Sequence, residues 1–327
     1  MQRAYWCGRN QHLPVWPDKK YSERLLGRYV VEVELGESVK LFKSAHSLPY
    51  HRRYLNRGSY MIDYQGKTVL VTGAASGIGA ALAHALGERG ARVLCADINI
   101  EDARRVAGAI GNDSQAMHCN LADPTAAEQL IADCVSISGQ LDLVCSNAGI
   151  GHRSNVIEQD MQNSTDLAQL FEINFYAALK IAKAYSHFLS ETGQVGRLMV
   201  TASEHSLSLP SAVKRSSMAF YGATKHAILI ALEWMQVDLQ DGPLELHVLL
   251  PGAVYTPLIA KALPDPALAP PELELISAPE CAAIALRGLD LGLFYIPTQA
   301  HLLQDMQPRI QEIQRSLTAL NLLDPAS

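Results

Sequence analysis

The chain of 327 residues is 48% hydrophobic and 18% charged, which supports a sizeable core and excludes a disordered or fibrous protein. Its net charge of −6 provides no general basic surface, so nucleic acid and anionic membrane are not predicted partners. The sequence lacks an apolar run of about 18 residues and a signal-peptide core, so neither a membrane span nor secretion is expected. The six cysteines lack metal-ligand spacing, which predicts no metal site, reduced thiols and a cytoplasmic location.

The first 60 residues differ in composition from the rest of the chain. They carry a net charge of +6 and nine of the 21 aromatic residues, whereas the remainder carries −12. Within them, residues 29–35 alternate like an edge strand. We predict an N-terminal extension over residues 1–62 and one domain over 63–327. The extension is either a partner-binding arm or lid, or a poorly ordered segment, or upstream sequence added by a misplaced start ahead of Met61.

From Gly66 onward, short apolar runs alternate with longer helical patterns, which is typical of βαβ units. Strands are predicted at residues 68–71, 92–96, 115–119, 141–145, 197–201, 244–250 and 294–296. Helices are predicted at residues 77–90, 98–110, 124–138, 166–191, 217–239, 279–291 and 301–320. The pattern therefore predicts an α/β fold: a single doubly wound Rossmann domain, with a seven-stranded parallel sheet and helices on both faces.

A glycine-rich turn joins the first strand to the first helix, with the sequence T-G-A-A-S-G-I-G over residues 72–79. Backbone N–H groups at a helix N-terminus can bind a pyrophosphate there, provided that no side chains obstruct its approach. The alternative is a tight strand–helix crossing without a ligand. The candidate cofactor-binding residues of this turn are Gly73, Ser76, Gly77, Ile78 and Gly79.

Asp97 ends the second strand, 24 residues after Gly73, where a carboxylate can accept hydrogen bonds from ribose hydroxyls. Its charge would repel a 2′-phosphate, and Ala74 and Ala75 supply no cation to bind one. NAD is therefore favoured over NADP. The alternative role for Asp97 is to start the following helix.

Tyr221 and Lys225 are four residues apart in a predicted helix, so they share one face of that helix. A nearby ammonium favours phenolate, which predicts a lowered pKa for Tyr221 and proton exchange with a substrate oxygen. On its own, such a pair is usually a surface pair, and the upstream glycine turn reverses that interpretation.

These motifs resemble those of the short-chain dehydrogenase/reductase family: a T-G-x-x-x-G-x-G turn, an N-A-G segment, a Y-x-x-x-K pair and a later P-G. The resemblance covers about residues 63–300. It implies that Tyr221 is the general acid/base and that Lys225 binds the nicotinamide ribose and lowers the tyrosine pKa. Ser203 would bind the substrate oxygen, with Ser206 and Ser208 as nearby alternatives in an expanded loop. Asn174 would hold a proton-relay water, or else bond a neighbouring carbonyl group.

The resemblance also assigns cofactor contacts after later strands. The N-A-G segment would lie against the adenosine ribose, although Ser146 stands where the family usually has a first Asn. The P-G segment would contact the nicotinamide. Where the family has an acidic residue near the adenine, this chain has an Asn-Leu pair, whose amide oxygen can still accept a hydrogen bond. The residues concerned are Asn147, Ala148 and Gly149; Pro251, Gly252, Val254 and Thr256; and Asn120 and Leu121.

Residues 258–279, which we call the lid segment, are rich in Pro, Ala and Leu and occupy the place of the family's substrate lid. An apolar lid predicts a hydrophobic or aromatic secondary alcohol, or its ketone, as the small-molecule substrate. Alternatively, the lid segment only packs on a neighbouring subunit. Glu204, His205 and Tyr255 could add polar contacts, although we interpret His205 as a solvated loop residue.

The resemblance implies a homodimer or homotetramer in which helices 166–191 and 217–239 pack against their symmetry mates. Apolar residues at helical spacing between Leu302 and Leu317 predict a final packed helix. Two other functions remain open: an NADPH-dependent carbonyl reductase, and a non-catalytic NAD-binding scaffold or sensor.

Overall fold

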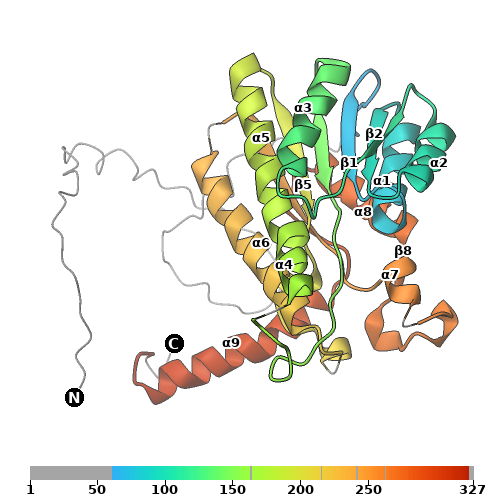
Figure 1. Ribbon diagram of the computed structural model, residues 1–327. Helices are drawn as coiled ribbons and strands as arrows, with labels where there is room; N and C mark the ends of the chain where they lie inside the picture. Colours follow the sequence, from blue (N-terminus) through green and yellow to red (C-terminus); the bar gives the residue numbers. More distant parts are fainter. Residues whose placement is uncertain (1–60, 163, 215, 241, 262, 324–327) are drawn as a thin grey trace, which may run out of the picture. The chain divides into compact units, whose positions relative to one another are not determined.

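The computed structural model describes residues 61–323 apart from 163, 215, 241 and 262 (Figure 1). The predicted N-terminal extension up to residue 60, including the expected strand at 29–35, lies outside the described residues.

Seven parallel strands form one sheet in the order β3-β2-β1-β4-β5-β6-β9, which confirms the predicted doubly wound fold. Every strand begins and ends within two residues of its predicted bounds. The buried strands β1 and β4 lie centrally, as is usual for a parallel sheet covered on both faces. The strands are β1 Thr68–Thr72, β2 Arg92–Asp97, β3 Gln115–His118, β4 Leu143–Ser146, β5 Gly196–Thr201, β6 Leu244–Leu250 and β9 Tyr295–Pro297.

Helices cover both faces of this sheet (Figure 1). Side chains of α1, α2 and α8 share one apolar cluster with inward-facing residues of β1 and β2. Side chains of α3, α5 and α6 form the other cluster, against the opposite face. The bounds are α1 Gly77–Glu88, α2 Ile100–Ile110, α3 Ala126–Ser138, α4 Thr165–Phe171, α5 Ala177–Thr192, α6 Ala219–Asp238 and α8 Ala278–Asp290.

Two local features differ from the sequence prediction. The helix expected at 166–191 is interrupted by a π-helical turn, Glu172–Tyr176, which contains Asn174. The lid segment begins within a short helix, α7 Pro257–Ala260, and contains two 3₁₀ turns and strand β8, Ile276–Ser277. This strand pairs in parallel with β7, Val254–Tyr255, so the lid segment is tied to the chain that follows β6.

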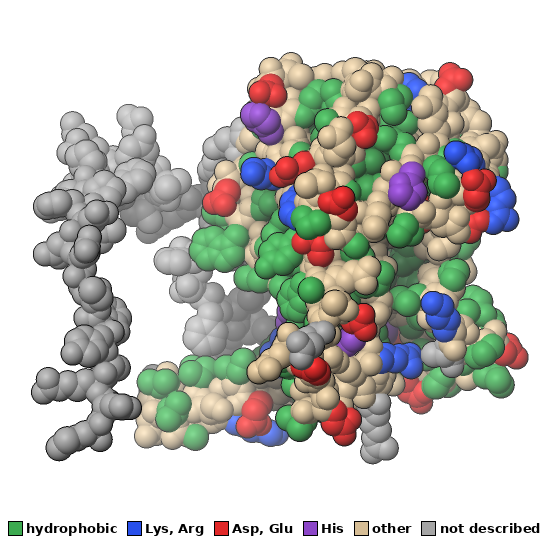
Figure 2. Space-filling view, viewed as in Figure 1, with side chains coloured by type: hydrophobic (Ala, Val, Ile, Leu, Met, Phe, Trp, Pro, Cys, Tyr) green, Lys and Arg blue, Asp and Glu red, His purple; other side chains and the backbone are tan. Residues whose placement is uncertain are grey.

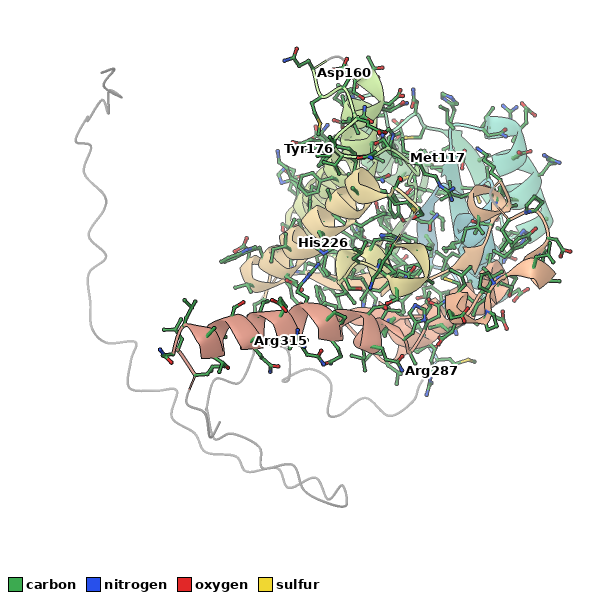
Figure 3. All side chains as sticks on the ribbon, turned by 90° about the horizontal axis from the view of Figure 1, so that it is seen from below. Met117, Asp160, Tyr176, His226, Arg287 and Arg315 are labelled. Atoms are coloured by element: carbon green, nitrogen blue, oxygen red, sulfur yellow. The ribbon has the colours of Figure 1, made fainter. Side chains whose placement is uncertain are left out.

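The last helix, α9 Leu302–Ala319, corrects the expectation that its apolar residues are packed. Leu302 is the buried residue of this helix, whereas the side chains of Ile310 and Ile313 are 39% and 53% exposed. Seen from below, α9 lies beneath α6, and the guanidinium of Arg309 contacts His226 of α6 at 3.2 Å (Figure 3). Beyond that contact, the C-terminal part of α9 extends away from the sheet and its covering helices (Figure 1). Among the described residues, no helix combines the length and the apolar character that a bilayer crossing requires.

Candidate active site

The predicted site residues follow the carboxyl ends of β1, β2, β4, β5 and β6, which share one edge of the parallel sheet. Ligands of open α/β sheets bind at this edge, near the point where the strand order reverses. Here the reversal lies between β1 and β4, so the glycine turn and the N-A-G segment stand on either side of it.

The glycine turn is packed so tightly that side chains would not fit. A Cβ added at Gly79 would lie 2.0 Å from the carbonyl oxygen of Gly73 and 2.7 Å from Nδ2 of Asn147. Gly77 has φ +55°, and a Cβ there would lie 3.1 Å from Cγ2 of Thr256. The side chain of Ser76, the N-cap of α1, makes no capping hydrogen bond. First-turn N–H groups of α1 thus remain for an anion, which fits a pyrophosphate.

Asp97 lies at the end of β2 and binds the glycine turn. Its Oδ2 accepts a hydrogen bond from the backbone N–H of Ala75 at 3.0 Å, and its Oδ1 accepts one from Asn99 at 2.8 Å. Helix α2 is capped by the side chain of Asn99 instead. Each oxygen of the Asp97 carboxylate keeps acceptor capacity for a ribose hydroxyl.

Asn147 joins the ends of three strands. Its Nδ2 donates to the carbonyl oxygen of Thr72 at 3.2 Å, and its Oδ1 accepts from the hydroxyl of Thr201 at 3.1 Å. The hydroxyl oxygen of Thr72 also accepts from the backbone N–H groups of Asn147 and Ala148. Neither threonine is among the predicted site residues: Thr72 only opens the glycine-turn motif, and Thr201 belongs to no motif.

Of the other residues predicted to contact the adenosine, two are exposed and one is buried in the core. Gly149 is exposed, and a Cβ there would lie 3.3 Å from Oδ1 of Asn174. Asn120 is exposed and its Oδ1 accepts from the backbone N–H of Ala122 at 3.1 Å. Leu121 is buried in the apolar cluster, so its side chain contributes to packing.

Tyr221, on the first turns of α6, lies beside the loop that follows β5. The Ser203 side chain lies close enough to the phenol to lower its pKa, so Ser203 is the serine that the structure brings to Tyr221. The ring of His205 packs edge-on against the ring of Tyr221, with centroids 5.4 Å apart. His205 is buried, contrary to the expected solvated position, and burial together with the charge of His226 lowers its pKa to about 4.

The charge relationship between Lys225 and Tyr221 also differs from the prediction. Nζ of Lys225 lies 5.7 Å from the centroid of the Tyr221 ring and donates to the carbonyl oxygen of Thr201 at 2.9 Å. Burial lowers the pKa of Lys225 to about 8. Burial raises the pKa of Tyr221, the Ser203 side chain lowers it, and the charge of Glu204 raises it further. The expected lowering is therefore wrong for this arrangement, because desolvation outweighs the stabilisation of phenolate.

Asn174 is buried within the π-helical turn, a feature frequent at functional sites. Its Oδ1 accepts from the backbone N–H of Ile150 at 2.8 Å, and its Nδ2 donates to the carbonyl oxygen of Ile150 at 2.9 Å. The side chain thus fixes the chain that follows the N-A-G segment. This is the second of the two roles considered from the sequence, bonding to a neighbouring carbonyl group.

The P-G segment after β6 lies between the loop after β5, which carries Ser203 and Glu204, and Gln299 near the start of α9. The backbone N–H of Gly252 donates to Oε1 of Gln299 at 2.8 Å. A Cβ at Gly252 would lie 2.7 Å from that oxygen and 3.1 Å from Oε2 of Glu204. Val254 is buried in β7, and Thr256 precedes α7 opposite Gly77. The segment therefore faces the glycine turn across the site.

A charged cluster that the sequence analysis missed adjoins this segment. Carboxylate oxygens of Glu204 and Asp305 and a ring nitrogen of His301 lie within 4.8 Å of one another. Glu204 and His301 are hydrogen-bonded to each other, and Asp305 accepts two hydrogen bonds from Ser211. We therefore interpret the group as a hydrogen-bonded cluster. Glu204 lies 97 residues before His301 in the sequence, so no motif could reveal the cluster.

Comparison with known proteins gives consistent findings. The sequence profile described as short chain dehydrogenase matches residues 67–267. The chain is 32% identical over 256 residues to a 1-deoxy-11-beta-hydroxypentalenate dehydrogenase of Streptomyces avermitilis, covering 77% of this chain and 92% of that protein. Its fold is similar to that of a short chain dehydrogenase/reductase from Burkholderia phymatum in complex with NAD, with TM-score 0.67, 22% identity and coverage of 78% and 97%. It is also similar to a short-chain dehydrogenase from Sphingobium yanoikuyae in complex with NADPH, with TM-score 0.61, 21% identity and coverage of 80% and 98%.

Proposed function

Because the chain belongs to the short-chain dehydrogenase family, and is an NAD(P)-dependent oxidoreductase of alcohols and ketones, we propose a specific reaction for it. It interconverts a hydrophobic or aromatic secondary alcohol and the corresponding ketone, with Tyr221 as general acid/base. The observation that carries this proposal is the placement of Tyr221 beside Ser203 at the carboxyl edge of the sheet, with Nζ of Lys225 5.7 Å from the centroid of the phenol ring.

Each of these residues has a defined part in the proton transfer. In the reductive direction, Tyr221 donates its phenolic proton to the substrate oxygen, and in the oxidative direction it takes that proton from the alcohol. Ser203 positions the same oxygen through its hydroxyl, and Lys225 binds a ribose hydroxyl from its fixed place on Thr201. When bound, the nicotinamide supplies or accepts the hydride at the substrate carbon.

The residues of the site fit a dinucleotide, and we infer that NAD is preferred to NADP. The uncapped start of α1 would hold the pyrophosphate through backbone N–H groups. The Asp97 carboxylate would accept hydrogen bonds from the adenosine ribose and repel a 2′-phosphate. Asn147 and its neighbours would border that ribose, and Val254 and Thr256 would bind the carboxamide. Equal turnover with both cofactors would favour the alternative of an NADPH-dependent carbonyl reductase.

Apolar side chains at the mouth of the site support a hydrophobic substrate. Leu258 of the lid segment would contact a Cβ at Gly151 at 3.3 Å, so the lid segment lies against the loop after β4. Leu258 is itself 50% exposed, and Val156 on the same loop is also exposed. A backbone bridge from Ser154 to Met218 brings this loop to the start of α6, close to Tyr221.

The test is a screen of secondary alcohols of graded size, followed by the absorbance of reduced nicotinamide with NAD and with NADP. The variant Tyr221→Phe should lower turnover by about 10²- to 10⁴-fold while leaving NAD affinity nearly unchanged. Turnover equal to that of the wild type would overturn the mechanism and would favour a non-catalytic NAD-binding scaffold or sensor.

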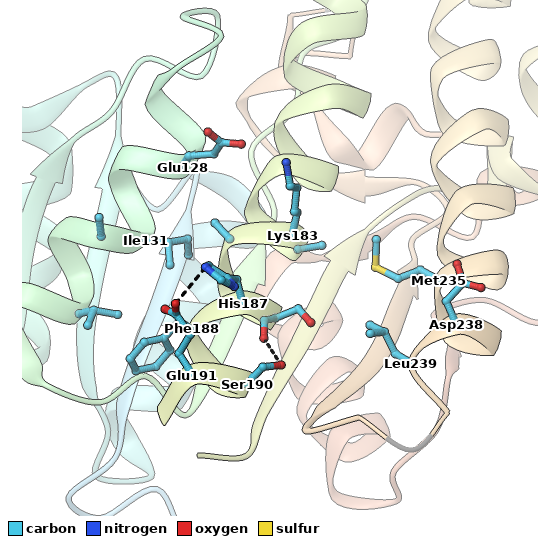
Figure 4. A pocket seen from close by; sticks show the side chains of 15 residues that line it. Glu128, Ile131, Lys183, His187, Phe188, Ser190, Glu191, Met235, Asp238 and Leu239 are labelled. Carbon is cyan, nitrogen blue, oxygen red and sulfur yellow. Dashed lines mark hydrogen bonds and ion pairs between the residues drawn. The ribbon is translucent and has the colours of Figure 1, made fainter. Parts of the chain in front are cut away.

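We further propose that the chain forms a homodimer or homotetramer through α5 and α6. Hydrophobic side chains gather along these helices on the viewed face (Figure 2), and Trp234 is 66% exposed. An open hollow adjoins them between α3, α5 and α6 (Figure 4), with Phe188 and Met235 among its apolar residues and charged side chains around them. A second copy of the chain would cover this face. Light scattering should show Trp234→Glu as a smaller species than the wild type, whereas Leu303→Glu on α9 should not change the mass.

We infer that the chain resides in a reducing compartment such as the cytoplasm. All five cysteines among the described residues are buried free thiols. The pKa of Cys95 and of Cys145 is raised by burial to about 12, so these thiols are unreactive near neutral pH.

A further inference from the structure

His301 lies immediately before α9, between two carboxylates from distant parts of the chain. Its Nε2 is 2.8 Å from Oε2 of Glu204, on the loop that carries Ser203. Its Nδ1 is 3.1 Å from Oε2 of Glu274, in the lid segment. One imidazole ring thus joins the catalytic loop, the lid segment and the start of the last helix. We call His301, Glu204 and Glu274 the His301 cluster.

Gln299, two residues before His301, also binds the lid segment: its side chain forms hydrogen bonds with backbone groups there and in the P-G segment. Its Nε2 donates to the carbonyl oxygen of Ala253 at 3.0 Å and to that of Glu274 at 3.3 Å. Its Oε1 accepts from the backbone N–H of Gly252. The short connection between β9 and α9 therefore contacts the lid segment twice, once through each side chain.

The backbone of Glu274 is an independent sign that these contacts matter. This residue has φ +44° and ψ +46°, the left-handed conformation that is unfavourable for a residue other than glycine. Such a conformation persists only where neighbouring contacts determine it. Here the carbonyl group is held by Gln299 and the carboxylate by His301. The backbone of the lid segment is thus strained at Glu274, the residue that contacts both Gln299 and His301.

We propose that His301 is a positioning residue: by binding Glu204 and Glu274 together, it holds the lid segment closed against the loop that carries Ser203. The contact itself is independent of the reaction, whereas the role of the segment as a substrate lid rests on the proposed function. The cluster also affects the phenol, because the charge of Glu204 raises the pKa of Tyr221. A protonated His301 offsets the charge of Glu204. The protonation of His301 therefore affects both the closure of the lid segment and the pKa of Tyr221.

The charge on His301 determines when this contact is strong. Burial lowers the pKa of His301, but the hydrogen bond to Glu204 and the nearby charges of Glu204 and Glu274 outweigh burial, so the pKa is raised overall. Among the described residues, Asp305 of α9 also faces the cluster, and its carboxylate accepts a hydrogen bond from Ser211. The guanidinium of Arg309 is directed instead to the carbonyl oxygen of Leu207 and the ring of His226. The stabilisation is complete below the ordinary histidine pKa and is lost as the pH rises through the raised value. Burial also raises the pKa of Glu204, so this carboxylate gains a proton earlier than usual when the pH falls.

The experiment measures the cluster in the full-length protein without relying on turnover. The His301 resonance, identified by its loss in His301→Gln, is titrated by NMR in the wild type, in Glu274→Gln and in Glu272→Gln. Glu272 is an exposed acid on the 3₁₀ turn just before Glu274 and serves as the matched control. We expect a raised His301 pKa that falls by about half a unit or more in Glu274→Gln and stays in place in Glu272→Gln.

Hydrogen exchange of peptides from the lid segment gives the second measurement, at pH 6 and pH 8.5, after correction for intrinsic rates. Protection should fall several-fold at the higher pH in the wild type and should be equally low at both values in His301→Gln. An unraised His301 pKa, or lid protection independent of pH, would overturn the proposal. An active Tyr221→Phe variant with an intact His301 titration would instead overturn only the proposed function.

Discussion

Nζ of Lys225 is bonded to the carbonyl oxygen of Thr201, at the end of β5, and not to the hydroxyl of Tyr221. The lysine therefore has a fixed position next to the phenol ring without forming an ion pair with it. Its burial lowers its pKa to about 8, so its charge is lost not far above neutral pH. The acid/base behaviour of the pair consequently depends on pH in a way that the four-residue spacing alone does not predict.

The charge of Lys225 should matter most at neutral pH. Lys225→Met should lower kcat/KM by about 10²-fold or more at pH 7, because the cation and its proposed contact with the nicotinamide ribose would both be lost. The ratio of wild-type to variant activity should decrease above pH 8, since the wild-type lysine is then itself increasingly neutral. Measuring kcat/KM from pH 6.5 to 9.5 tests this, and a ratio constant across that range would contradict it.

The raised pKa of Tyr221 should favour ketone reduction near neutral pH. Below its pKa the residue is a phenol and can donate a proton, whereas alcohol oxidation requires the phenolate, which forms only as the pH rises towards the raised value. We expect the oxidation rate to increase steadily from pH 7 to 10 while the reduction rate falls. Initial rates in both directions with one alcohol–ketone pair provide the measurement. An oxidation optimum at or below pH 7 would show that the phenol is acidic after all.

The sequence predicted the sheet and the cofactor edge because both depend on local patterns. Short apolar runs between helical patterns predicted all seven strands of the sheet, and the T-G-A-A-S-G-I-G sequence predicted the glycine turn between β1 and α1. The sign of the Tyr221 pKa shift was not predictable, because it depends on how deeply the fold buries the ring and on the charge of Glu204. Likewise, the contact between Glu204 and His301 joins segments that the topology brings together and that no spacing rule relates.

Asp97 should control the choice between the two cofactors. Asp97→Asn removes the charge but keeps an oxygen that can accept from the Ala75 N–H, so the glycine turn should keep its conformation. We expect the ratio of kcat/KM for NADP to that for NAD to rise about tenfold, which corresponds to ~1.4 kcal/mol. Steady-state kinetics with each cofactor measure the ratio. An unchanged ratio would mean that the carboxylate only fixes the turn.

Two glycine-to-alanine substitutions should have opposite effects on stability. At Gly79 the new Cβ would lie 2.0 Å from the carbonyl oxygen of Gly73, a backbone atom that cannot move without opening the turn. At Gly108, within α2, no atom lies within 4 Å of the new Cβ, and alanine favours the helix. Gly79→Ala should therefore lower the free energy of unfolding by about 3 kcal/mol and weaken NAD binding. Gly108→Ala should raise it by about 0.5–1 kcal/mol and leave NAD binding unchanged. Urea unfolding and NAD titration of both variants measure these effects. Equal stabilities of the two variants would contradict the prediction. They would mean that the turn relaxes around the new methyl group and that close packing does not explain the glycine at position 79.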